Sequence, residues 1–216
     1  MHVVAIIPAR GGSKRLPRKN IYPVLQVPML CWVIRACQGS RHITGVYVST
    51  EDPEIAAVAR EWSAAVIERP KELANDEIQK QDAIVHAVEH LLAHGRAPDI
   101  VLSVQPNSPE LTGHDLDRGI EKFLAYQLWE LFSVDSNLVQ NGAFRVMRKD
   151  TVFLRTLSVH CGVTVCDCVD IHTIEDVAEA EGRLTRRQAR IPVLPRETQP
   201  RTSRPVAERR RPGGGP

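Results

Sequence analysis

Long apolar runs are absent from this chain. None of its 216 residues belongs to an apolar stretch approaching the roughly 20 residues that span a bilayer. The N-terminal run Val3–Ile7 ends at Pro8, and it lacks the basic lead-in and the small-residue cleavage site of a secretory signal. These absences predict a cytoplasmic protein with no membrane partner.

Cysteine is scarce, and its number is odd. Five cysteines cannot all form internal disulfides, and reduced thiols are the expected state of a cytoplasmic chain. Cys161, Cys166 and Cys168 follow His160, but their spacing is not the C-x-x-C of zinc sites. Cys166 and Cys168 alternate with valines as strand residues do. We therefore expect buried free thiols here rather than a metal site.

Positive charge is concentrated at the C-terminal end. Residues 183–216 hold ten arginines, two acids and six of the 15 prolines, a net charge of +8 that leaves −6 on residues 1–182. This end has too few apolar residues to form a core. We predict a folded domain over residues 1–184 and an Arg/Pro-rich disordered tail over 185–216. The acidic domain does not favour nucleic acid, and the basic tail is the part that would attract it.

Elsewhere, short β-branched runs alternate with helical patterns. Val3–Ile7 is continuously apolar, as a strand buried on both faces would be. Thr112 and Thr173 each precede an aspartate by three residues, which is typical of a helix start. The alternation predicts an α/β fold: a doubly wound, mostly parallel sheet with helices on both faces. Strands are expected at 3–7, 46–49, 65–67, 100–104, 143–147 and 162–169, and helices at about 30–37, 53–62, 76–94, 112–124 and 173–184.

The loop at residues 8–20, after the first expected strand, is the most informative stretch, because such sheets bind ligands beyond the carboxyl ends of their strands. It holds Gly11 and Gly12 and five cationic side chains within ten residues. Glycines let backbone amides approach a ligand, and clustered cations suit a polyphosphate. The pattern is neither a Walker A loop nor the dinucleotide motif G-x-G-x-x-G. A polyphosphate site is the favoured interpretation, and a solvated basic loop is the alternative.

Six segments, in order, resemble motifs of the acylneuraminate cytidylyltransferase family, the synthetases of CMP-activated sugar acids. Residues 6–21, with P-A-R-G-G-S-K at their centre, resemble the family's opening. The other five are V-S-T-E-D at 48–52, R-P-K-E-L-A-N-D at 69–76, Q-P-N-S-P at 105–109, N-G-A at 141–143 and D-I-H-T at 170–173. One such motif is a weak signal, but six in the family's order are a strong one. Together they cover about residues 3–184.

The resemblance implies a Rossmann-like nucleotidyltransferase that transfers CMP from CTP to the anomeric hydroxyl of a nonulosonic-type sugar acid and releases pyrophosphate. It implies a magnesium cofactor held by Asp170. His172 follows two residues later as a second candidate metal ligand, and its imidazole makes manganese an alternative. Arg10 and Lys19 correspond to catalytic residues at the phosphates, and Gln105 corresponds to a substrate contact. The implied nucleotide-binding residues are Ala9, Arg10, Gly11, Gly12, Ser13, Lys14, Lys19, Asn20, Arg69 and Asp76.

The chain departs from the family pattern in three places. His172 stands where a second metal-binding aspartate is usual. On an extended segment it would face the same side as Asp170 with room for a hydrated ion between them, or it would merely hydrogen-bond nearby. Asn107 replaces a threonine, and Glu110 stands where an apolar residue is common, so this acid is expected to face an acidic sugar unfavourably. Only residues 135–140 lie where the family commonly has a longer segment that packs on a second subunit. The sugar acid and a homodimer therefore stay open.

Two alternatives stay open for the function. The chain is a nucleotidyltransferase for another nucleoside triphosphate or another sugar, or it is a non-catalytic homologue that retains the nucleotide cleft. His172 and the short segment at 135–140 favour the non-catalytic alternative. Metal-dependent release of pyrophosphate would exclude it. Sialic, pseudaminic, legionaminic and ketodeoxyoctonic acids are all compatible with the sequence.

Overall fold

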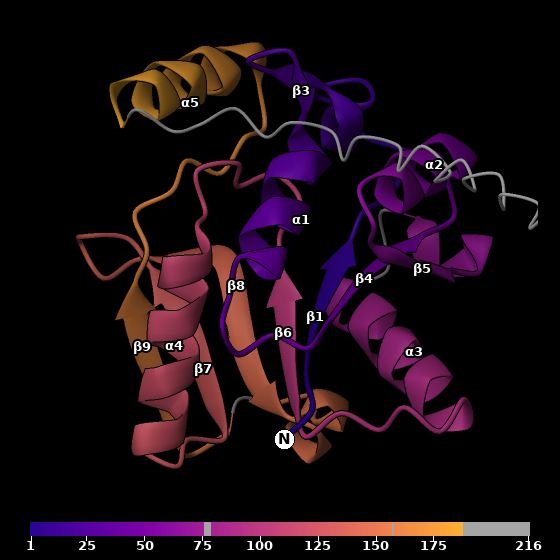
Figure 1. Cartoon of the computed structure of the whole chain (residues 1–216), viewed down its shortest axis with the longest axis vertical. Coiled ribbons are helices and arrows are strands. Elements are labelled where there is room, and N and C mark those ends of the chain that lie inside the picture. The colour runs from indigo at the N-terminus through magenta and orange to yellow at the C-terminus, as the bar shows by residue number, and fades with distance from the viewer. Residues whose placement is uncertain (76–78, 157, 188–216) are drawn as a thin grey trace, which may run out of the picture.

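A central sheet organises the described part of the chain, which in this computed structural model comprises residues 1–75, 79–156 and 158–187 (Figure 1). Within these ranges seven strands pair in the order β5-β4-β1-β6-β8-β7-β9, and two short strands form a separate hairpin. β8 pairs antiparallel with β6 and β7, and the other pairs of the large sheet are parallel. The predicted mostly parallel α/β sheet is confirmed.

Strands and helices alternate along the chain, as the sequence predicts. The strands of the large sheet are β1 (Val3–Pro8), β4 (Gly45–Thr50), β5 (Ala65–Glu68), β6 (Ile100–Val104), β7 (Glu130–Val134), β8 (Gln140–Arg148) and β9 (Cys161–Val165). The hairpin strands are β2 (Pro23–Val24) and β3 (Val27–Pro28). The helices are α1 (Met29–Gln38), α2 (Pro53–Glu61), α3 (Lys80–Ala93), α4 (Gly113–Ala125) and α5 (Ile174–Arg186), with 3-10 turns η1 (Lys19–Ile21), η2 (Lys71–Ala74) and η3 (Asp150–Phe153). None of these helices is long and apolar enough to cross a bilayer.

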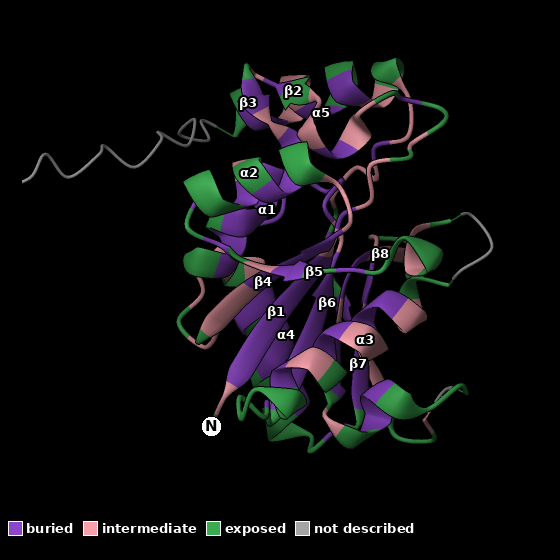
Figure 2. Cartoon of the chain, turned by 90° about the vertical axis from the view of Figure 1, so that its right-hand side faces the viewer, coloured by how far each residue is buried: buried purple, intermediate pink, exposed green. Residues whose placement is uncertain are grey.

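The residues of β1 explain why helices cover both faces of the sheet. Val3, Ala5 and Ile7 pack into a cluster with apolar residues of α1, α2, α4 and α5. Val4 and Ile6 point to the opposite face and pack with α3 and η3. Successive side chains of a strand alternate between faces, so a continuous apolar run is buried only between two layers. Figure 2 shows β1 and β6 almost entirely in the colour of buried residues, and β4 in that colour over its second half.

Local capping fixes the helices at the carboxyl edge of the sheet. The side chains of Thr112 and Thr173 each accept from the backbone N–H of the aspartate three residues later, and that aspartate accepts from the threonine N–H. These capping boxes confirm the predicted starts of α4 and α5. α2 begins at Pro53 with Asp52 as its cap. The third helix, expected from about Asp76, begins only at Lys80, after an extended Gln79; Asp76 itself lies outside the described residues.

Two strands differ from the prediction. β7 does not stand out in the sequence because it begins with Glu130, a fully buried carboxylate that pairs with Arg145 of β8 at 2.7 Å. The strand expected over 162–169 ends at Val165. The backbone turns there, and the carbonyl of Cys166 accepts from the N–H of Cys168 at 3.0 Å. Residues 166–173 therefore form an irregular segment between β9 and α5.

The cysteines agree only in part with the expectation of buried free thiols. All five cysteines are free, but of the three expected to be buried in this region only Cys166 is buried, while Cys161 is exposed and Cys168 is half-buried. The thiols of Cys166 and Cys168 face each other at 3.4 Å.

The described residues end at Arg187, just after α5, so all but the first three residues of the expected tail lie outside them. The boundary at 184 stays a prediction.

Candidate functional site

Two adjoining cavities lie at the carboxyl ends of β1 and β6. The first, of about 250 Å³, opens between the loop after β1, the segment before α3 and residues 105–107. The second, of about 310 Å³, opens between the loop after β1 and His172. Arg10, Ser13 and Lys19 line both cavities, so the two share a wall. We refer to the two cavities together as the cationic recess. It lies at the edge where parallel sheets bind their ligands.

The glycine loop is anchored to the residues that follow β4. The N–H of Gly11 donates to Oε1 of Glu51 at 2.7 Å, and Arg18 pairs with Asp52 at 2.6 Å. A Cβ on Gly11 would overlap the Asp52 carboxylate, so packing within the protein requires glycine there. A Cβ on Gly12 would meet nothing within 4 Å. The open side of the loop is therefore at Gly12, and the amide of Gly11 is already committed to a protein acceptor.

Two buried residues that line the first cavity each hold a polar atom without a hydrogen-bond partner among the described residues. Nη2 of Arg69 lies 2.7 Å from Oε2 of Glu51, yet its buried Nε has no hydrogen-bond partner among the described residues. Nδ2 of Asn20 donates to the carbonyl of Arg10 at 2.8 Å, while its buried Oδ1 has no partner in the same ranges. Buried polar groups are normally hydrogen-bonded. The wall of this cavity therefore encloses one donor and one acceptor that have no partner among the described residues.

Two lysines bring positive charge to the recess from different elements. Lys19 begins η1 and Lys80 begins α3, and both line the first cavity. Burial lowers the pKa of Lys19, and the nearby arginines Arg15 and Arg10 lower it further against the opposing charge of Asp170. Desolvation likewise lowers the pKa of Lys80, again against Asp170. A bound polyanion would offset both effects by stabilising the protonated lysines.

Asp170 has protein partners at both carboxylate oxygens. Its Oδ1 accepts from Nδ2 of Asn107, and its Oδ2 lies 3.0 Å from Nε2 of His172. The expectation of an extended segment with space for an ion between Asp170 and His172 is wrong. The backbone is irregular here, and the two side chains touch directly. Both are about one third exposed, so the pair borders solvent at the recess.

Glu110 does not face the recess, contrary to the expectation that it would oppose an acidic sugar. Its side chain is fully buried, with Oε1 2.9 Å from Nε of Arg183. Its Oε2 accepts from the N–H of Val169 at 2.8 Å. The reason is tertiary packing: α5 places Arg183 against the loop between β6 and α4, which holds Glu110. The residues around Glu110 in the sequence do not indicate that contact.

Most of the predicted site residues line the cationic recess. Asp76 lies outside the described residues, and Asp170 borders the recess through its contacts with Asn107 and His172. Ala9 is fully buried behind the loop, where its N–H donates to the Ser49 carbonyl at 3.0 Å. Gly11 and Gly12 belong to the loop without lining either cavity. Arg10, Ser13, Lys19, Asn20, Arg69 and Gln105 line the first cavity, and Arg10, Ser13, Lys14, Lys19 and His172 line the second.

The start of α3 is a contribution that the sequence analysis missed. Gln79 and Lys80 line the first cavity beside Asn75, whose carbonyl accepts from Nη1 of Arg10 at 3.1 Å. One signal was available in the sequence. α3 directly follows a loop assigned to the ligand edge, so a lysine in its first turn lies near that edge.

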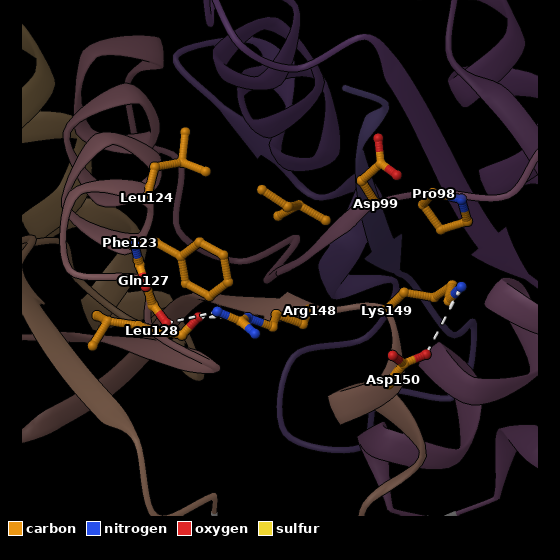
Figure 3. A pocket seen from close by; sticks show the side chains of 10 residues that line it. Pro98, Asp99, Phe123, Leu124, Gln127, Leu128, Arg148, Lys149 and Asp150 are labelled. Atoms are coloured by element: carbon orange, nitrogen blue, oxygen red, sulfur yellow. Dashed lines mark hydrogen bonds and ion pairs between the residues drawn. The ribbon is translucent and has the colours of Figure 1, made fainter.

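A larger cavity, of about 350 Å³, opens at the opposite edge of the sheet, where β6 begins and β8 ends (Figure 3). Its cations are engaged by the protein itself. Arg148 donates from Nε to the carbonyl of Leu128 at 3.1 Å and from Nη2 to that of Gln127 at 2.7 Å. Lys149 lies 3.8 Å from Asp150. The cationic recess, which also holds two desolvated lysines, is the better candidate site.

A family profile described as "Cytidylyltransferase" matches residues 4–152, which is more than half of the chain. The chain belongs to the cytidylyltransferase family. The matched range includes the glycine loop, Arg69 and Gln105, and it ends before Asp170. The family resemblance seen in the sequence motifs is thereby confirmed, and the cationic recess lies largely within the matched range.

Curated relatives of this cytidylyltransferase-family chain match over part of their length. The chain is 37% identical to the N-acylneuraminate cytidylyltransferase A of Danio rerio over 62% of this chain and 30% of that protein. It is 35% identical to the pseudaminic acid cytidylyltransferase of Campylobacter jejuni over 62% of this chain and 58% of that protein. The match thus spans less than two thirds of either relative.

A solved structure described as CMP:2-keto-3-deoxy-manno-octonic acid synthetase complexed with CTP has the same fold. It superimposes with a TM-score of 0.68 and covers 87% of this chain and all of that chain, at 15% sequence identity. A cytidylyltransferase from Leptospira borgpetersenii gives a TM-score of 0.66 at 16% identity. These likenesses confirm the predicted nucleotidyltransferase-like fold of the family member described above.

Proposed function

We propose that this protein transfers CMP from CTP to the anomeric hydroxyl of a sugar acid and releases pyrophosphate. The observation that supports this most directly is the cationic recess, where Arg10, Lys19 and Lys80 meet from three elements. Desolvation lowers the pKa of both lysines, which is the condition that a bound polyphosphate would reverse. The family membership and the two named relatives support cytidine as the base.

In the proposed reaction, the anomeric oxygen of the sugar attacks the α-phosphorus of CTP. A new bond forms between this oxygen and the α-phosphorus, while the bond from the α-phosphorus to the oxygen that bridges to the β-phosphate breaks. Pyrophosphate leaves with the electron pair of the broken bond, and the proton of the hydroxyl passes to solvent. Catalysis of this kind depends on positioning and on neutralising charge. Arg10 and Lys19 line both cavities, so they can contact both the α-phosphate and the departing pyrophosphate.

The residues present fit a magnesium ion that is shared with the substrate. Among the described residues, no group of three or more His, Cys, Asp or Glu side chains gathers as a ready ligand set. Mg²⁺ is commonly held by one or two carboxylates together with substrate phosphates, and Asp170 offers one carboxylate at the recess. When bound, the ion would neutralise phosphate charge. Asp170 would hold it, and His172 would orient that carboxylate; the imidazole suits manganese better than magnesium.

We further infer a nonulosonic-type sugar acid as the acceptor. The named relatives act on N-acylneuraminate and on pseudaminic acid by their descriptions. A carboxylate on the acceptor also suits a recess with several cations. Glu110 is turned away from the recess, so it does not repel such a carboxylate.

A pyrophosphate-release screen tests the proposal. CTP, UTP, ATP and GTP are each combined with sialic, pseudaminic, legionaminic and ketodeoxyoctonic acids, with Mg²⁺ or Mn²⁺. We expect release with CTP and at least one acid, and none without metal. Release with another triphosphate alone would contradict the base assignment. CTP binding without any release would point to a non-catalytic homologue.

A further inference from the structure

The loop between β6 and α4 holds the backbone on both sides of Asp170. On one side, Oε2 of Glu110 accepts from the N–H of Val169 at 2.8 Å. On the other side, the carbonyl of Asn107 accepts from the N–H of Ile171 at 3.1 Å, and Nδ2 of Asn107 donates to the Ile171 carbonyl at 2.9 Å. These residues lie in an irregular segment outside β9, so no strand ladder holds them. Their position therefore depends on such individual contacts.

Glu110 is itself fixed by α5. Nε of Arg183 lies 2.9 Å from Oε1 of Glu110, and Nη1 of Arg187, the residue after α5, lies 3.7 Å from the same oxygen. Both contacts are ion pairs by distance, because Oε1 has no hydrogen-bond partner among the described residues. Nη2 of Arg183 also donates to the carbonyl of Asp167 at 2.7 Å. The Glu110 carboxylate is fully buried, where a charge without a partner is strongly disfavoured. Arg183 thus connects the loop, the segment before Asp170 and α5 through one side chain.

We propose that Glu110 is a positioning residue for Asp170, acting together with Arg183. The ion pair fixes Oε2 of Glu110 where it receives the Val169 N–H, and this contact sets the backbone that carries Asp170 to the recess. Asn107 and His172 then orient the carboxylate itself through its two oxygens. The inference rests on the proposed function in one respect, namely the assignment of a divalent ion to Asp170.

Three variants and one matched control test the proposal. Glu110→Leu removes both the charge and the acceptor for Val169, whereas Glu110→Gln retains an acceptor. Asp170→Asn removes the carboxylate that is to be positioned. The control is Asp117→Asn, which removes another nearly buried carboxylate, one that pairs with Arg41 at 3.0 Å and lines neither cavity of the recess.

Each protein is titrated with Mn²⁺ in the presence of CTP, with free Mn²⁺ followed by electron paramagnetic resonance. Thermal melting, CTP affinity without metal and pyrophosphate release against metal concentration are measured alongside. We expect Glu110→Leu to weaken Mn²⁺ binding by about 10- to 100-fold, in the range found for residues that orient metal ligands. Its CTP affinity without metal is expected to stay that of the wild type. Glu110→Gln should restore most of the Mn²⁺ affinity, and Asp117→Asn should lower the melting temperature without changing Mn²⁺ binding.

The metal titration separates this inference from the proposed function. If the wild-type protein binds Mn²⁺ through Asp170 but releases no pyrophosphate, the proposed function fails, and the comparison of the Glu110 variants still decides the positioning role. Wild-type Mn²⁺ affinity in folded Glu110→Leu overturns the inference. So does a loss that Asp117→Asn reproduces, or a wild-type protein that does not bind Mn²⁺ with CTP. Should Glu110→Leu fail to fold, the contrast between Glu110→Gln and Arg183→Met gives the same decision, because the first keeps the acceptor and the second removes the charge that fixes it.

Discussion

The two edges of the central sheet both carry cavities and cations, but they differ in how those cations are compensated. At the opposite edge, Arg148 is engaged by two backbone carbonyls and Lys149 faces Asp150 (Figure 3). At the carboxyl edge, desolvation lowers the pKa of both Lys19 and Lys80, and each lies in the field of Asp170. The cations at the opposite edge thus have partners within the protein, whereas the two desolvated lysines at the carboxyl edge favour an added polyanion.

The largest of these three cavities is not the candidate site. The direction of the strands is the better guide, because parallel strands deliver their following loops to one edge. β1, β4 and β6 end at that edge, and their loops contribute Arg10, Glu51 and Gln105. β8 runs the other way, so its end contributes Arg148 to the opposite edge instead.

The largest expected difference between the edges concerns carboxylates. Asp170→Asn should lower turnover by at least about 100-fold, because a direct metal ligand should cost no less than the partners that orient it. The matched change at the opposite edge, Asp150→Asn, should leave turnover unchanged. Steady-state pyrophosphate release measures both. Full metal-dependent activity in Asp170→Asn would mean that the ion is held elsewhere.

The next difference concerns nucleotide binding by the cations. Lys19→Ala and Arg10→Ala should each lose a charge-assisted contact of about 1.5–3 kcal/mol, roughly 10- to 150-fold in CTP affinity. Lys149→Ala, the same change at the opposite edge, should leave the affinity as it is. Isothermal titration calorimetry gives all three values. Equal affinities in all three variants would remove the basis for a phosphate site in the recess.

The pH dependence of CTP binding is expected to be a smaller effect. The pKa of Lys19 is lowered in the free protein, and bound phosphate favours its protonated form. Affinity should therefore be highest below that lowered pKa and should decline as the pH rises through it. Lys19→Arg should flatten the decline, because arginine stays protonated. Lys149→Arg serves as the control, and an alkaline decline that persists unchanged in Lys19→Arg would show that Lys19 is not its source.

The smallest effect is expected at the C-terminal end. A chain that ends at Arg190 retains Arg183 and Arg187, the two residues that pair with Glu110. It should keep the melting temperature and turnover of the full chain, because the remaining residues have too few apolar side chains to pack as a core. Differential scanning calorimetry and the pyrophosphate assay check this. A melting temperature lower by several degrees would show that the tail docks on the domain.

Much of the fold could be predicted because the signals are local. The apolar run of β1 and the capping threonines of α4 and α5 each depend on a few neighbouring residues. β7 could not be predicted this way, because its first residue is an acid whose burial depends on Arg145 of another strand. The end of β9 depends on a turn within the chain that alternation of valines and cysteines does not reveal.

The candidate site likewise has parts that the sequence predicts and parts that depend on tertiary contacts. Loop 8–20 was recognisable from its glycines and cations, since both its chemistry and its edge follow from short stretches of sequence. Lys80 and Glu110 were not, because one is brought to the recess by the placement of α3 and the other is drawn away from it by Arg183 of α5.

Local composition was enough to predict the sheet, the edge expected to bind ligands and the family motifs, since periodicity, capping and glycine placement act over a few residues. Only tertiary packing decided that Asp170 and His172 touch each other, that Asn107 holds the segment between them, and that Glu110 is buried. Asp170 and His172 are only two residues apart, but the backbone that brings them together is held by Asn107 and Glu110, whose partners there lie 59 to 64 residues away in the sequence.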